Sequence, residues 1–138
     1  MQSSAPVSWK EKLVPPAKAL ENIEAGMNIF IGTGVGEPRT MVKHLMGSDT
    51  HKMHDLTLIQ LVSFGDAISL KELRSQRYRL KTFYSGWVAS EAVAAGRVDL
   101  IPSRVSEIPR LIYKRYIPID AALIQISEPN EAGYCSLG

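Results

Sequence analysis

The sequence predicts an α/β fold: an open, mostly parallel sheet with helices on both faces. Short apolar runs alternate along the chain with amphipathic segments that have helical spacing. The apolar runs are hydrophobic throughout, as strands are when both of their faces are buried. At 138 residues the chain has room for one ordinary domain. We expect residues 1–9 to be a loose segment and the domain to span residues 10–138.

Composition excludes several classes of protein. Hydrophobic residues make up 45% of the chain and charged residues 22%, which is typical of soluble globular domains and not of disordered chains. A net charge of +2 is too small to indicate a nucleic-acid partner. No stretch approaches the roughly 20 apolar residues of a membrane span, and the N-terminus lacks a secretory signal. We therefore expect a cytoplasmic protein without a membrane or nucleic-acid partner.

The first half of the chain alternates helix and strand. We predict, in order, a helix over 17–24, a strand over 28–31, a helix over 38–47 and a strand over 56–62. Gly26 suits a left-handed turn after the first helix. Pro38 suits the first position of the second helix, where its missing N–H does no harm. That helix presents an apolar face made of Met41, Val42, Leu45 and Met46.

The second half continues the alternation. We predict, in order, a strand over 80–84, a helix around 90–95 closed by Gly96, a strand over 98–101, a helix after Ser106 and a strand over 121–126. Ser106 is the predicted N-cap of its helix, with Pro109 in the first turn. The single cysteine, Cys135, cannot form an internal disulfide, and we expect it to be a small buried residue.

A glycine-rich segment, Gly32-Thr33-Gly34-Val35-Gly36-Glu37-Pro38, joins a predicted strand to a predicted helix. Such a turn directs backbone N–H groups at whatever binds there. The dinucleotide motif needs its third glycine one residue later, and a phosphate-binding P-loop needs a lysine before the helix. Glu37 also places a carboxylate where a pyrophosphate would lie. The donors suit a carbonyl or thioester oxygen, and a simple tight turn remains equally open.

The other titratable residues give weaker signals. His44, His51 and His54 lack the cysteine or acidic companions of a metal site, so we predict surface histidines and no metal. Glu91 and Glu107 fall in the first turns of predicted helices, where negative charge is favoured for structural reasons. A catalytic role for either glutamate stays open.

Three motifs in order, residues 32–40, residues 106–111, and residues 122–129 with 133–138, resemble the N-terminal domain of the acetyl-CoA hydrolase/transferase family. This family includes 4-hydroxybutyrate and succinyl-CoA:acetate CoA-transferases. The resemblance implies an open α/β domain from a two-domain enzyme, with the active site between the domains. The chain also stops at Gly138 without a polar tail or docked helix, so we expect a truncated sequence.

The resemblance also implies roles for particular residues. The family's nucleophilic glutamate lies in the C-terminal domain, beyond Gly138, so no catalytic residue is expected here and Glu37 does not match it. Gly34, Val35, Gly36 and Pro38 match the family's Gly-x-Pro loop, which lies against the acyl or carboxylate end of the substrate. Coenzyme A is then part of the substrate and no cofactor stays bound. The full-length protein would be a homodimer, and this chain alone would be inactive.

A different class of function remains as the alternative. The chain could be a freestanding module that holds a small carboxylate or coenzyme A through the glycine segment, without catalysis. Strong binding by this chain alone would favour the module, because half of a cleft should bind poorly.

Overall fold

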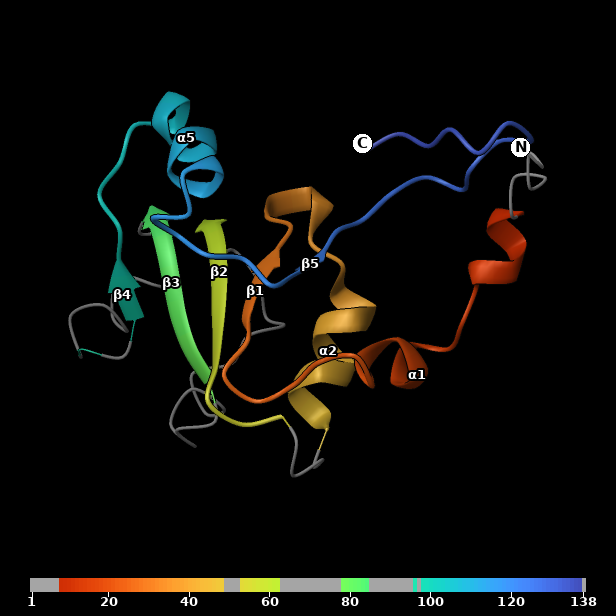
Figure 1. Ribbon diagram of the computed structural model, residues 1–138, viewed down its shortest axis with the longest axis horizontal. Coiled ribbons are helices and arrows are strands. Elements are labelled where there is room, and N and C mark those ends of the chain that lie inside the picture. The colour runs from red at the N-terminus through yellow and green to blue at the C-terminus, as the bar shows by residue number, and fades with distance from the viewer. Residues whose placement is uncertain (1–7, 49–52, 63–77, 85–95, 97, 138) are drawn as a thin grey trace, which may run out of the picture.

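A computed structural model describes residues 8–48, 53–62, 78–84, 96 and 98–137. Its centre is a five-stranded sheet in which every neighbouring pair is parallel, in the order β4-β3-β2-β1-β5 (Figure 1). The strands are β1 (Asn28–Ile31), β2 (Leu56–Val62), β3 (Tyr78–Tyr84), β4 (Val98–Leu100) and β5 (Ala121–Leu123). The helical elements are η1 (Trp9–Lys12), α1 (Pro16–Leu20), η2 (Gly34–Gly36), α2 (Arg39–Gly47), η3 (Val105–Glu107) and α5 (Ile108–Tyr113).

Both faces of the sheet are covered by helices, as predicted. On one face α1 and α2 pack over a core that includes Ile29, Leu58 and Leu45. On the other face α5 packs over Ile59 and Phe83, and Figure 1 shows it beyond the tips of β2 and β3. Successive residues of a strand point to opposite faces, so a strand with two buried faces is apolar throughout.

The connections between the strands identify a switch point in the topology. From β1 the chain moves strand by strand to β4, and then returns to the other side of β1 to form β5. Crossover connections between parallel strands are almost always right-handed, so the connecting helix changes face when the chain reverses its direction across the sheet. Accordingly, α2 packs on one face and α5 on the other. The carboxyl ends of β1 and β5 therefore diverge at the point where open α/β sheets form ligand crevices.

Several predicted elements are confirmed. The strands over 28–31 and 56–62 have the predicted bounds, and Gly26 has a φ of +79°. The second helix begins at Arg39 directly after Pro38, with its predicted apolar face in the core. The first helix ends early, at Leu20, where the Asn22 side chain donates to the carbonyl of Ala19. Such local side-chain bonds compete with continuation of a helix.

Two predictions about the last third are wrong. The strand expected over 121–126 ends at Leu123, because the neighbouring β1 has already left the sheet and offers no further partner. Ile124 is consequently 51% exposed. Ser106 does not cap a helix, because a separate 3₁₀ turn spans Val105–Glu107 and the α-helix begins after it, at Ile108.

Other predictions differ in extent or cannot be compared. β3 begins at Tyr78, earlier than the predicted start at residue 80, and β4 ends at Leu100. The helix predicted around 90–95 lies outside the described residues. No helix in the described part of the chain is long and apolar enough to cross a membrane.

Candidate functional site at the carboxyl edge of the sheet

The candidate site lies at the carboxyl edge, the edge of the sheet where the carboxyl ends of the parallel strands meet. Here the glycine loop, residues 32–38, leaves β1 while the chain leaves the adjacent β5 (Figure 1). A cavity of about 480 Å³ opens between the two segments. It is lined by Thr33, Val35 and Gly36 from the loop and by Gln125, Ile126, Ser127, Ser136 and Leu137 from the C-terminal segment. The cavity therefore lies at the switch point of the topology.

The glycines of the loop have different physical roles. A Cβ on Gly32 would lie 2.7 Å from the carbonyl oxygen of Gly36, so the loop folds back where only glycine fits. Gly34 has a φ of +62°, a conformation that side chains disfavour. Gly36 has open space around its missing Cβ and an ordinary φ. Two glycines thus shape the loop, and the third leaves the cavity free of a side chain.

The loop presents backbone donors at its tip. The Gly36 and Glu37 amides donate to the carbonyls of Thr33 and Gly34, and these bonds form the short 3₁₀ turn η2. The amides of Gly34 and Val35 donate to no described residue. Open amides at the start of a helical turn can donate to a carbonyl or carboxylate oxygen. The Val35 side chain is fully exposed beside them.

The four residues predicted to bind substrate differ in their position relative to the cavity. Val35 and Gly36 line the cavity, and Gly34 contributes an open amide at the tip of the loop. Pro38 is buried and precedes α2, so it fixes the direction in which the loop leaves the site. Their role in binding remains a prediction.

A hairpin-shaped loop forms the second wall of the cavity. This C-terminal hairpin, residues 127–136, is closed by a bond from the Ser127 amide to the Ser136 carbonyl and by a bond from the Ser136 amide to the Ser127 hydroxyl. The Asn130 side chain accepts bonds from two amides at the tip, those of Ala132 and Tyr134. Because the hairpin extends away from the sheet, its side chains lie uncovered. Cys135 is therefore exposed, and the prediction of a buried cysteine is wrong.

Two buried polar side chains near this edge were not predicted as a feature. Glu37 is 6% exposed and Gln60 of β2 is fully buried. Among the described residues, the Glu37 Oε1 atom and both amide atoms of Gln60 have no hydrogen-bond partner. Glu37 does not line the cavity. The sequence could have indicated a buried polar group here, because Gln60 interrupts the otherwise apolar run of residues 56–62.

The remaining candidates stay at the surface. His44 is exposed, with Nδ1 at 2.8 Å from the Thr40 carbonyl, and His54 is exposed as well. Both agree with the prediction of surface histidines, whereas His51 lies outside the described residues. The Glu107 carboxylate forms an ion pair with Arg110 one helical turn later. Glu91 also lies outside the described residues.

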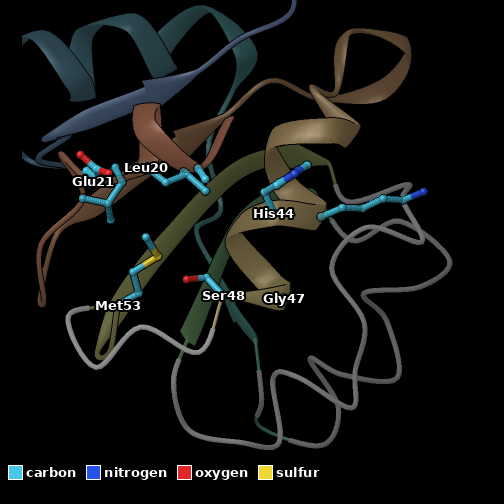
Figure 2. Close-up of a pocket in the computed structure, with 9 residues that line it drawn as sticks. Leu20, Glu21, His44, Gly47, Ser48 and Met53 are labelled. Carbon is cyan, nitrogen blue, oxygen red and sulfur yellow. The ribbon is translucent and has the colours of Figure 1, made fainter. Parts of the chain in front are cut away.

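A larger cavity of about 720 Å³ lies between α1 and α2. Figure 2 shows Leu20 and Glu21 on one side, with His44, Gly47, Ser48 and Met53 around the rest. Gly47 ends α2, and Met53 precedes β2, so this cavity is near the amino ends of the strands. None of the residues predicted to bind substrate lines it.

Comparison with known proteins identifies the family. The profile described as the acetyl-CoA hydrolase/transferase N-terminal domain matches residues 2–138. The chain belongs to this family. Solved structures with the same fold include RipA from Yersinia pestis, with a TM-score of 0.75 at 22% identity over 94% of this chain and 32% of that one. A 4-hydroxybutyrate CoA-transferase from Porphyromonas gingivalis has a TM-score of 0.67 at 21% identity, over 94% of this chain and 30% of that one.

Two curated relatives of the chain are CoA-transferases. The chain is 35% identical over 130 residues to 4-hydroxybutyrate coenzyme A transferase of Clostridium kluyveri, which covers 94% of this chain and 30% of that protein. It is 30% identical over 122 residues to a succinyl-CoA:acetate/propanoyl-CoA:succinate CoA transferase of Fasciola hepatica, over 84% of this chain and 24% of that protein. The chain therefore spans less than a third of the length of these relatives.

Proposed function

We propose that this chain forms the N-terminal wall of the acyl-CoA cleft in a CoA-transferase or acetyl-CoA hydrolase. The observation that carries the proposal is the pair of open amides beside an apolar cavity at the switch point between β1 and β5. Membership of the acetyl-CoA hydrolase/transferase family supports the reaction class. The acyl end of the substrate would lie against Gly34, Val35 and Gly36, and the buried Pro38 would hold the loop in place behind them.

The proposed reaction needs a carboxylate nucleophile from a second domain, beyond residue 138. A glutamate carboxylate attacks the thioester carbonyl and the carbon–sulfur bond breaks. Coenzyme A departs as the thiolate, and an acyl-glutamyl anhydride remains on the protein. The thiolate then attacks the glutamyl carbonyl, which releases the product acid and leaves a glutamyl-CoA thioester. An acceptor carboxylate or water resolves this intermediate. The amides of Gly34 and Val35 would stabilise negative charge as it develops on the carbonyl oxygen.

The proposal extends to the rest of the protein. Coenzyme A enters and leaves as part of the substrate, and the acceptor is a small carboxylate. The chain supplies no nucleophile of its own, so it should bind acetyl-CoA weakly and turn it over at no measurable rate when assayed alone. The full-length protein would be a homodimer in the cytoplasm.

The substitution Gly36→Val tests the proposal in the full-length protein. The missing Cβ of Gly36 faces open space, so valine should leave the fold intact while placing its methyl groups in the cavity. We expect kcat/KM for acetyl-CoA to fall at least about tenfold, because a small displacement of substrate costs this much or more. Gly47→Val is the matched control, since Gly47 also faces open space but lies at the end of α2.

Two results would contradict the proposal. Near-normal turnover in a folded Gly36→Val enzyme would remove the glycine loop from the active site. Tight binding of acetyl-CoA, coenzyme A or acetate by this chain alone, measured by calorimetry, would instead support the freestanding binding module.

A further inference from the structure

The hydroxyl group of Thr33 fills a gap in the hydrogen bonding of the sheet. The register pairs Phe30 with Ile59, so counting along both strands places Thr33 opposite Val62. By that point β1 has ended and its backbone has turned into the glycine loop. The Val62 amide instead donates to the Thr33 hydroxyl at 3.2 Å, and the hydroxyl donates to the Val62 carbonyl. One side chain thus satisfies both backbone groups of Val62 that face the departing strand.

Val62 is a firm anchor for this contact. It pairs with Tyr84 on its other side, at the end of β3. The preceding carbonyl, that of Leu61, accepts a bond from the Thr82 hydroxyl at 3.1 Å. On the opposite flank of the glycine loop, the Gly32 amide donates to the Leu123 carbonyl of β5 at 2.9 Å. The base of the loop is therefore fixed to β5 through a backbone bond and to β2 through a side chain.

We propose that Thr33 is a positioning residue for the CoA-transfer reaction. It fixes the start of the segment that carries the open amides of Gly34 and Val35, the next two residues, beside the cavity that Thr33 and Val35 line. Its single hydroxyl hydrogen already binds Val62, so the hydroxyl acts on substrate through those amides and not by donating to it. This inference rests on the proposed function of the loop.

The test compares Thr33→Val, which has nearly the same shape without the hydroxyl, with Thr33→Ser, which keeps it. In the full-length enzyme we expect Thr33→Val to lower kcat about tenfold with little change in KM for acetyl-CoA, because the amides act on charge that develops during reaction. Hydrogen exchange at Gly36 and Glu37, whose amides are bonded within the loop, should become about tenfold faster, since the loop opens more readily. Thr33→Ser should restore both values. Thr57→Val in β2, near the amino edge, is the matched control and should change neither.

The two readouts separate this inference from the proposed function. Unchanged kcat and unchanged exchange in Thr33→Val would overturn the positioning role. Faster exchange with unchanged kcat in Thr33→Val would also overturn the positioning role. If kcat/KM were unchanged in Gly36→Val as well, the proposed function of the loop would also fail. If Thr33→Val does not fold, Thr33→Ala replaces it, and equal kcat and exchange in the alanine and serine variants would contradict the proposal.

Discussion

Strand β1 is joined to β5 at both of its ends, and the two junctions are built differently. At the amino edge, the Asp120 carboxylate accepts bonds from the Asn28 amide at 2.7 Å and from its side-chain nitrogen at 2.9 Å. The Asp120 amide returns a bond to the Asn28 carbonyl at 2.8 Å. At the carboxyl edge the strands separate after the bond from Gly32 to Leu123, and the amides of Gly34 and Val35 donate to no described residue.

If the proposed function holds, this difference separates a structural junction from a binding junction. Polar groups at the amino edge bind one another, so changes there should alter stability without altering chemistry. At the carboxyl edge the open amides lie beside exposed apolar side chains, including Val35, Ile126 and Leu137. Contiguous exposed apolar surface with unpaired donors is typical of a surface that another molecule or domain covers.

Gly32→Ala should have the largest effect, because it damages the carboxyl edge directly. The new Cβ would lie 2.7 Å from a backbone oxygen, that of Gly36, so the loop itself must shift. We expect a loss of about 1–3 kcal/mol in the free energy of unfolding, as for other overpacked sites. Thermal and denaturant unfolding measure this loss. Gly36→Ala, with open space at its Cβ, is the control, and equal stability of the two variants would contradict the described geometry.

Gly34→Ala should have a smaller effect on stability. The φ of +62° at Gly34 costs a side-chain-bearing residue about 1 kcal/mol, although nothing lies within 4 Å of the added Cβ. Denaturant unfolding should show this loss, and Gly34→Asn should recover part of it because asparagine tolerates the left-handed conformation. A loss as large as that of Gly32→Ala would mean that Gly34 is also sterically confined.

Asp120→Asn tests the amino edge and should have a modest effect that depends on pH. Hydrogen bonds from Asn28, backbone first and side chain second, hold the pKa of Asp120 below its ordinary value of 3.8. The ionised carboxylate therefore stabilises the fold above the unfolded-state pKa, and this contribution is lost as pH falls through the lower folded-state pKa. We expect the difference in Tm between wild type and variant to shrink as the pH drops below about 4.

The control for this comparison is Asp99→Asn, at an exposed position in β4. In the full-length enzyme, Asp120→Asn should leave kcat near its wild-type value at neutral pH, because the amino edge is not part of the proposed site. A Tm difference that grows on acidification would contradict the account of this junction.

Substitution of Cys135 should have the smallest effect on stability, and its thiol tests whether the C-terminal hairpin is exposed to solvent. It lies uncovered on the C-terminal hairpin, so a thiol reagent should label it in the folded protein without denaturant. Cys135→Ser should change the free energy of unfolding by less than about 0.5 kcal/mol, as is usual for surface substitutions. Labelling that requires denaturant would show that the hairpin is covered.

The sequence predicted the central strands well because their signals are local. The apolar runs at residues 28–31 and 56–62 end at glycine, aspartate or another turn-forming residue, and pairing on both sides matches their length. The apolar run at residues 121–126 looked equally convincing. Its length depended on where β1 leaves the sheet, which is a property of another segment and not of the run itself.

The place of the glycine loop in the fold was predictable, but its detailed geometry was not. Three closely spaced glycines between a strand and a helix located the loop, but the sequence could not show which glycine is sterically confined and which is free. The contact between Thr33 and Val62 depends on strand register, and threonine in a loop gives no signal of it. The exposure of Cys135 likewise depends on the absence of a covering layer over the hairpin.

The most direct test of the central claim compares the two edges of β1 in one hydrogen-exchange experiment. The full-length protein is measured with and without a saturating acetyl-CoA analogue in which a methylene group replaces the thioester sulfur and prevents cleavage. We predict slower exchange at Gly34 and Val35 at the carboxyl edge, and unchanged exchange at Asn28 and Asp120 at the amino edge. Saturation by the analogue with no protection at Gly34 and Val35 would contradict the claim that the glycine loop binds the acyl end of the substrate.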